Sequence, residues 1–110
     1  MTCDDVIAEL RKRCLSFEGA IEDMPWEGHF GWKVKGKLFA IGGEGSNRVT
    51  VKSTPDKQAA LIQLEGVERA AYVGRFGWVT VTIEDDTALE LAKGLIGESY
   101  EAAAKKGRRK

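Results

Sequence analysis

The chain is poor in the residues that most often hold metal ions or perform catalysis. It has one histidine, His29, and two cysteines, Cys3 and Cys14, without the CxxC or HxxxH spacing of metal sites. A hydrolytic nucleophile at Ser46 or Ser99 would need His29 as its base, because there is no other histidine. We therefore expect no metal, no cofactor and no catalytic residue, so that the protein is not an enzyme.

Long apolar runs are also missing. None approaches the ~20 residues that a membrane span requires, and the start Met-Thr-Cys-Asp-Asp lacks the basic and apolar parts of a secretory signal. Cys3 and Cys14 fall on one predicted helix, where ~16 Å separates them, too far for a disulfide. The 110 residues, of which 43% are hydrophobic, fit one compact domain. We expect a cytoplasmic monomer with reduced thiols and no membrane contact.

Net charge is absent as well, but the charges are unevenly distributed. The chain has 17 basic and 17 acidic side chains, and five of the basic ones lie in the last six positions. Residues 1–104 therefore carry 12 basic against 17 acidic groups, a net charge of −5. We predict a single domain over residues 1–104 and a basic, disordered tail over residues 105–110. Residues 33–52 form a local cationic patch, with only Glu44 as an acid, made of Lys33, Lys35, Lys37, Arg48 and Lys52.

What the sequence does have is the alternation typical of strands with one buried face. One side of the predicted sheet is hydrophobic, with Trp32, Val34, Phe39, Ile41, Val49, Val51, Val79, Val81 and Ile83. The other side carries Lys33, Lys35, Arg48, Thr50, Lys52, Trp78, Thr80 and Thr82. Such a cationic face can bind a polyanion, because cations neutralise phosphates and an exposed indole stacks on bases. A solvated sheet face without any ligand has the same composition.

Two successive hairpins follow from this alternation. Residues 32–35 and 38–42 are expected to pair across a tight turn with Gly36 at its first central position, so that Val34 lies opposite Phe39. A loop over residues 43–47 then leads into a strand over residues 48–52. Residues 20–25 look extended, residues 67–76 are ambiguous, and residues 77–83 are the clearest strand.

Three helices complete the expected α+β fold. The first is capped by Thr2 and ends near Gly19, and the second begins at Ser53-Thr54-Pro55 and ends near Gly66. The third starts with a capping box at Thr87 and continues to about residue 103. We predict a two-layer architecture, in which an antiparallel sheet of about five strands packs against the N- and C-terminal helices.

A set of short motifs runs through most of the chain in a fixed order. These are Phe17 to Pro25-Trp26, the stretch from Trp32 to Ala40, Val49 to Lys52 leading into Thr54-Pro55, Trp78-Val79, and Glu98-Ser99-Tyr100. In their order and spacing, from about residue 5 to residue 103, the chain resembles the MmcQ/YjbR family of small bacterial proteins.

The resemblance implies a frataxin-like (CyaY-type) α+β fold with a five-stranded antiparallel sheet backed by helices. It also implies a DNA-binding role described as a double-wing arrangement, and it supplies no catalytic residues. The two wings would correspond here to the turn around Gly36 and the loop over residues 43–47. Only Glu44 is charged in that second loop.

Our leading hypothesis is a non-catalytic DNA-binding module that uses the outer sheet face, the two hairpin turns and the C-terminal arm. The predicted contact residues are Lys33, Lys35, Lys37, Arg48, Lys52 and Arg75 on phosphates and Trp78 beside them. The rival hypothesis is a protein or small-molecule interaction domain without a nucleic-acid role. In that case a partly apolar site would be lined by Trp26, His29, Phe30 and Trp78.

Overall fold

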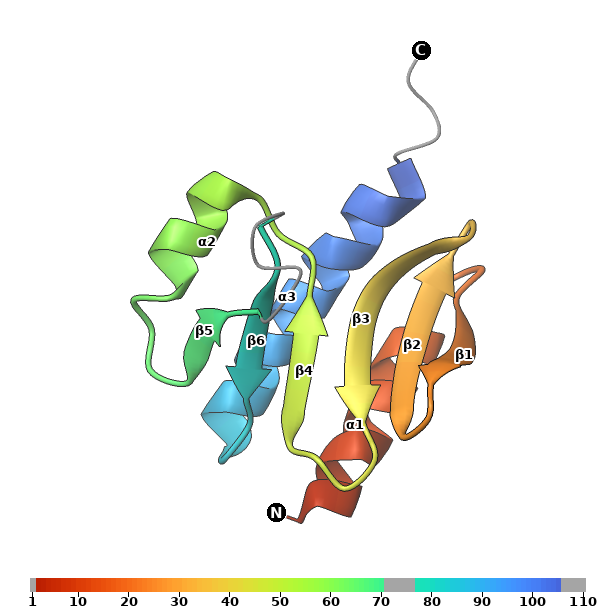
Figure 1. The fold of residues 1–110 in the computed structure, drawn as a ribbon, viewed down its shortest axis with the longest axis horizontal. Helices are drawn as coiled ribbons and strands as arrows, with labels where there is room; N and C mark the ends of the chain where they lie inside the picture. The colour runs from red at the N-terminus through yellow and green to blue at the C-terminus, as the bar shows by residue number, and fades with distance from the viewer. Residues whose placement is uncertain (1, 71–76, 106–110) are drawn as a thin grey trace.

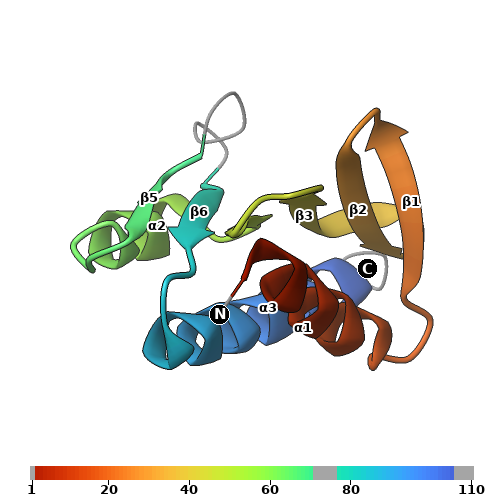
Figure 2. The same cartoon turned by 90° about the horizontal axis from the view of Figure 1, so that it is seen from below.

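A six-stranded antiparallel sheet with two helices packed on one face forms the body of the protein (Figures 1 and 2). The computed structural model describes residues 2–70 and 77–105, apart from the side chains of Pro25 and Trp26. The elements in chain order are α1 (Cys3–Leu15), β1 (Ile21–Trp26), β2 (His29–Val34), β3 (Lys37–Gly43), β4 (Arg48–Val51), α2 (Pro55–Leu61), β5 (Val67–Arg69), β6 (Val79–Thr82) and α3 (Asp86–Lys105).

The sheet has the strand order β1-β2-β3-β4-β6-β5. The predicted α+β class is confirmed, with six strands where the sequence predicted about five. The additional strand is β5, which lies in the segment that the sequence left ambiguous. It has three residues, and Val67 and Arg69 pair with Val81 and Val79 of β6. Three residues are too few for a period of two to be recognised in a sequence.

The first helix begins as predicted and ends earlier. The Thr2 hydroxyl accepts a hydrogen bond from the Asp5 backbone N–H, and the Asp5 carboxylate accepts one from the Thr2 N–H, which completes a capping box. The helix ends at Leu15, before the predicted end at Gly19. Its buried side chains, which face the sheet and α3, are Val6, Ile7, Leu10 and Cys14.

The register of the β2–β3 hairpin differs from the predicted one. Val34 pairs with Lys37, so Lys35 and Gly36 form the turn, both with positive φ (53° and 79°), as a type I′ turn requires. Phe39 is an extra residue between two pairs of the ladder, a β-bulge. The bulge buries both Phe39 and Ala40 and moves Ile41 to the outer face, where it pairs with Thr50. The predicted placement of Ile41 in the core is therefore wrong.

The other two helices also depart from their predicted bounds. The cap of α3 is Asp85, whose carboxylate accepts from the Ala88 backbone N–H, and the predicted cap at Thr87 is wrong. A carboxylate at this position also interacts favourably with the helix dipole. Lys105, predicted in the disordered tail, is the last residue of α3, whereas residues 106–110 lie outside the described residues. The Thr54 cap of α2 is confirmed, but the helix ends at Leu61 and not near Gly66.

The core lies between the sheet and the pair α1 and α3, which Figure 2 shows together below the strands. Apart from Ile41, all the hydrophobic side chains assigned to the inner face are buried there. In the same view β1 and β2 turn steeply upward, away from the helices. Among the helices of the described residues, none has the length and apolarity needed to cross a membrane.

Candidate nucleic-acid interface

The outer sheet face does not carry a continuous row of free cations. Lys33 Nζ lies 3.0 Å from Asp23 Oδ2 on β1, and an Arg48 guanidinium nitrogen lies 3.3 Å from Glu68 Oε2 on β5. Both acids sit on strands that the sequence did not place beside these cations. The hydrogen bond from Lys33 holds the pKa of Asp23 below its usual range, so the acid stays ionised and keeps its partner.

Of the remaining residues assigned to this face, Lys52 and Trp78 each lie one position beyond the Val51–Val79 pair that joins β4 to β6. Trp78 is partly buried just before β6, and its strand is separated from Lys33 on β2 by β3 and β4. Lys52 follows β4 and is partly buried, with further interactions of its own. Arg75 lies outside the described residues. Among the described residues, Lys33 and Arg48 therefore do not gather around Trp78, whereas Lys52 lies at the neighbouring position on β4.

Lys35, another of the predicted cations, has a partner outside the sheet. Lys35 lies in the type I′ turn, and its Nζ donates a 3.0 Å hydrogen bond to the backbone carbonyl oxygen of Ala104 in the last turn of α3. The C-terminal end of a helix carries unpaired carbonyls and partial negative charge, so a lysine ammonium is stabilised there. Lys37 follows in the first position of β3 and is exposed. Figure 1 shows the β2–β3 turn and the end of α3 at the same end of the molecule.

This contact brings together two cationic segments that lie far apart in the chain. Lys105 follows Ala104 directly, and the sequence continues with Lys106, Arg108, Arg109 and Lys110. We call residues 105–110 the basic segment, and the basic segment together with Lys35 and Lys37 the basic end. Each part is evident in the sequence, but 69 residues separate Lys35 from Ala104, and only the packing of α3 beside the hairpin makes them neighbours.

The two hairpin turns that would correspond to wings lie at opposite ends of β3. One is the turn at Lys35 and Gly36, and the other is the loop from Glu44 to Asn47. The seven residues of β3 separate them by ~23 Å, at ~3.3 Å per residue. Only the first turn contacts the described end of α3, through the bond from Lys35 to Ala104, so the two turns do not share one cationic surface among the described residues.

Two residues of the rival apolar site, Phe30 and Trp78, lie apart on the sheet. Phe30 packs against the core, with its ring centroid 6.3 Å from that of Trp32 and 4.8 Å from the Arg11 guanidinium carbon. Phe30 is on β2, whereas Trp78 precedes β6, three strand positions away. That separation is ~14 Å at ~4.8 Å per strand. The side chain of Trp26 lies outside the described residues.

Ser99, the more buried of the two serines considered as nucleophiles, holds parts of the fold together through hydrogen bonds. Its side chain is 1% exposed, and its Oγ donates a 2.6 Å hydrogen bond to the Phe39 carbonyl and accepts a 3.1 Å bond from the Lys52 backbone N–H. It thereby ties α3 to β3 and to the end of β4. Among residues 2–70 and 77–105, no three His, Cys, Asp or Glu side chains converge as metal ligands do.

The architecture defines the class of the protein, an α+β domain whose six-stranded antiparallel sheet is covered on one face by two helices. The family model named YjbR matches residues 15–102, and the chain belongs to the YjbR family. Among solved structures, the chain is similar to a protein from Pseudomonas syringae determined by a structural genomics consortium. The two are 17% identical, with a TM-score of 0.67, over 94% of this chain and 99% of the other. At that identity the likeness concerns the fold alone. None of the curated proteins matches this chain.

Proposed function

We propose that this protein is a non-catalytic, cytoplasmic module that binds DNA through phosphate contacts made by the basic end. The observation that carries the proposal is the hydrogen bond from Lys35 to Ala104, because it places the cationic turn at the start of the basic segment. Lys35, Lys37 and Lys105 are exposed there. Exposed ammonium groups can reach phosphates without first losing a buried partner.

The charge balance around this end supports an anionic ligand. Lys105 is 3.8 Å from Glu101, an exposed pair of the kind that contributes little and yields readily to a competing anion. The sheet face is a weaker candidate, because Lys33 is only 29% exposed in its 3.0 Å pair with Asp23 and is separated from Arg48 by β3. The resulting contacts position a nucleic acid and read no bases, so we expect weak, sequence-independent and strongly salt-dependent binding.

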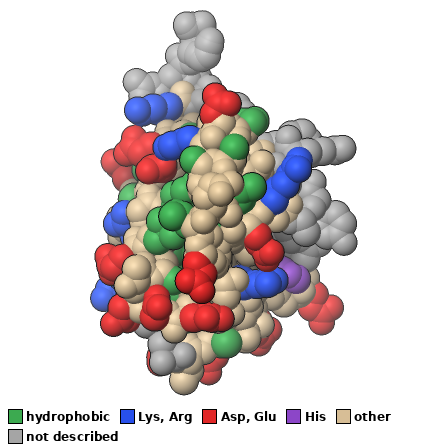
Figure 3. Space-filling model, turned by 90° about the vertical axis from the view of Figure 1, so that its left-hand side faces the viewer, with side chains coloured by type: hydrophobic (Ala, Val, Ile, Leu, Met, Phe, Trp, Pro, Cys, Tyr) green, Lys and Arg blue, Asp and Glu red, His purple; other side chains and the backbone are tan. Residues whose placement is uncertain are grey.

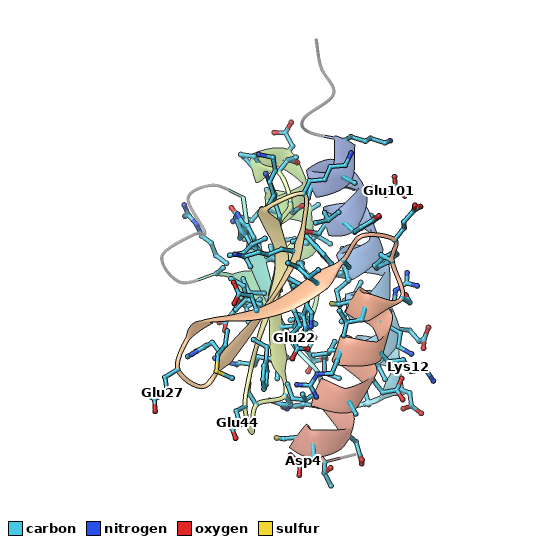
Figure 4. All side chains as sticks on the ribbon, turned by 90° about the vertical axis from the view of Figure 1, so that its right-hand side faces the viewer. Asp4, Lys12, Glu22, Glu27, Glu44 and Glu101 are labelled. Atoms are coloured by element: carbon cyan, nitrogen blue, oxygen red, sulfur yellow. The ribbon has the colours of Figure 1, made fainter. Side chains whose placement is uncertain are left out.

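The test is a titration of labelled duplex and single-stranded DNA with the full chain at several salt concentrations, followed by fluorescence anisotropy. The double variant Lys37→Glu, Lys105→Glu should weaken binding and reduce the slope of log affinity against log salt by about 2, one for each lost phosphate contact. A matched control is Lys12→Glu. It makes the same change of charge per residue at an exposed lysine on α1 (Figure 4).

The control should leave the slope unchanged. A second comparison is Lys33→Gln, which removes a cation of the sheet face and should also leave the slope unchanged. If neither DNA forms a complex at low salt, the proposed function is wrong. If Lys12→Glu lowers the slope as much per charge as the double variant does, binding follows total charge and the assignment to the basic end is wrong.

A further inference from the structure

A shallow hollow lies at the end of the molecule opposite the basic end. It has a volume of about 760 Å³ and is formed by the α2–β5 connection, the end of β6 and the first turns of α3. Its apolar part is Leu64, Ala88 and Leu91, and its acidic part is Glu65, Glu84 and Asp85. We call it the acidic hollow. Figure 3 faces the side of α2 and β5, where hydrophobic side chains gather above a band of acidic ones.

The hollow combines exposed hydrocarbon with negative charge, of which the part on Asp85 is balanced by the start of α3 that this residue caps. Leu64 is 46% exposed, and the neighbouring Ile62 is 39% exposed, so the apolar surface continues beyond the hollow. Arg48 also lines it, but this guanidinium is already paired with Glu68 at 3.3 Å. The fixed charges that face a ligand are therefore mainly carboxylates.

Such a surface matches lysine and arginine side chains better than purely charged or purely apolar ligands. Their aliphatic stems can cover leucine and alanine surface while the charged heads reach carboxylates at the rim. The chain contains a segment of this composition, Lys105 to Lys110, in which five of six residues are basic.

The basic segment of the same molecule cannot reach the hollow. Along α3, Lys105 lies ~30 Å from Asp85 in the acidic part of the hollow and ~21 Å from Leu91, the α3 residue of its lining nearest to Lys105, at ~1.5 Å per residue. The five residues after Lys105 span at most ~18 Å even when fully extended. Any contact between the basic segment and the hollow therefore joins two copies of the chain.

We propose that the acidic hollow binds the basic segment of a second copy, so that molecules associate head to tail at low ionic strength. Such a contact uses two different surfaces, leaves one of each free at the ends, and so extends into short chains of molecules instead of a closed dimer. The interaction is weak and screened by salt, because most of its charges are exposed. The monomer expected from the sequence is then the state at higher salt.

The test is sedimentation of the full chain without nucleic acid, over a range of protein concentrations at low and high salt. The wild-type protein should show a mass that rises with concentration at low salt and a monomer mass at high salt. Glu65→Gln with Glu84→Gln should raise the dissociation constant about three- to tenfold. Asp85 is kept, because it caps α3. The matched control Glu27→Gln with Glu44→Gln, at two exposed acids that do not line the hollow, should associate like the wild type (Figure 4).

A mixture of two variants gives the decisive result. The hollow variant, Glu65→Gln with Glu84→Gln, keeps an intact basic segment, and the segment variant, Arg108→Gln with Arg109→Gln, keeps an intact hollow. Each alone should associate weakly, whereas the mixture should form pairs with one copy of each and grow no further. A wild-type protein that stays monomeric at low salt, or a mixture that associates no better than its components, overturns the proposal.

This outcome is separable from the proposed function. The hollow variant leaves Lys35, Lys37 and the basic segment unchanged, so its affinity for DNA and the salt slope should equal those of the wild type. If the hollow variant loses self-association but keeps its DNA affinity, the result supports the role of the hollow and does not bear on DNA binding. If the protein forms no DNA complex, the proposed function is wrong, but the proposal for the hollow is unaffected.

Discussion

The indole Nε1 of Trp32 donates a 3.0 Å hydrogen bond to Glu22 Oε1, and the same carboxylate oxygen lies 2.7 Å from Arg11 Nε. Trp32 has no exposed surface, so this carboxylate satisfies the one polar group of a buried ring. It also joins three elements, α1, β1 and β2, at the point where Figure 4 shows Glu22 between β1 and α1. Glu22 is thus part of the packing of the helix against the sheet.

We expect Glu22→Leu to lower the free energy of unfolding by about 1–3 kcal/mol, because it leaves the buried indole N–H without an acceptor. Glu22→Gln keeps an amide oxygen for Trp32 and loses only the ionic part of the contact with Arg11, so it should cost less than about 1 kcal/mol. Urea unfolding followed by tryptophan fluorescence measures both. Equal losses in the two variants would show that the indole does not depend on this acceptor.

The same pair predicts a dependence on pH. The hydrogen bond from Arg11, and to a smaller extent the one from Trp32, lowers the pKa of Glu22 from its ordinary value of 4.5. A lowered folded-state pKa contributes stability that is complete above pH 4.5 and is lost as the pH falls through the folded value. The stability difference between wild type and Glu22→Gln should therefore be constant at neutral pH and shrink below pH 4.5. A stability difference between wild type and Glu22→Gln that grows on acidification would contradict this prediction.

Gly77 and Gly94 should respond in opposite directions to alanine. Gly77 has a φ of 96°, and a Cβ added to it would lie 2.8 Å from the Thr54 carbonyl carbon and 2.9 Å from the Ser53 carbonyl oxygen. Gly77→Ala should therefore destabilise the protein by about 2 kcal/mol or more. Gly94 lies inside α3 with open space around its position, so Gly94→Ala should stabilise by up to about 1 kcal/mol. Thermal unfolding measures both, and a neutral Gly77→Ala would rule out the close approach of residues 53–55.

Replacing Lys35 should stabilise the fold and weaken DNA binding at the same time. It is the one described non-glycine residue with a positive φ, 53°, and asparagine before glycine is favoured in a type I′ turn. We expect Lys35→Asn to raise the free energy of unfolding by about 0.5–1 kcal/mol while reducing the salt slope of DNA binding by about 1. Lys37→Ala, at an ordinary strand position, should reduce the slope without the gain in stability. A loss of stability in Lys35→Asn would show that the bond to Ala104 outweighs the backbone strain.

The two thiols should differ in reactivity. Cys14 is completely buried in α1, and burial raises the pKa of its thiol to about 12, whereas Cys3 is partly exposed. Because the thiolate is the reactive form, a thiol reagent should modify Cys3 in the folded protein and leave Cys14 unmodified until the chain unfolds. Mass spectrometry after alkylation checks this, with Cys3→Ser as the control that should remain unmodified. Rapid labelling of folded Cys3→Ser would contradict the burial of Cys14.

Much of the fold could be predicted because it rests on local patterns. A period of two assigned the inner residues of β4 and β6, Val49, Val51, Val79 and Val81, all of which are buried. The same rule failed after the bulge at Phe39, because one extra residue inverts the faces of everything that follows in the strand. Strand β5 was not predicted, because its three residues are too few to show an alternating pattern and form a strand by pairing with β6.

The candidate site was less predictable, because it depends on which residues become neighbours. The alternation correctly placed Lys33 and Arg48 on the same face of the sheet. It could not show that Asp23 and Glu68, on other strands, form ion pairs with them. In the same way, the basic composition of residues 105–110 was evident, whereas the contact of Lys35 with Ala104, directly before these residues, was not.

The sequence by itself determined the fold class, the caps of the first two helices and most of the hydrophobic face of the sheet, because capping and periodicity act between residues close in the chain. Its motifs were also sufficient to indicate the YjbR family, which the match over residues 15–102 establishes. Only the tertiary structure decided which charges are paired and which remain available. That outcome depends on strand order, register and the placement of α3, and these bring together ammonium and carboxylate groups that no local pattern relates.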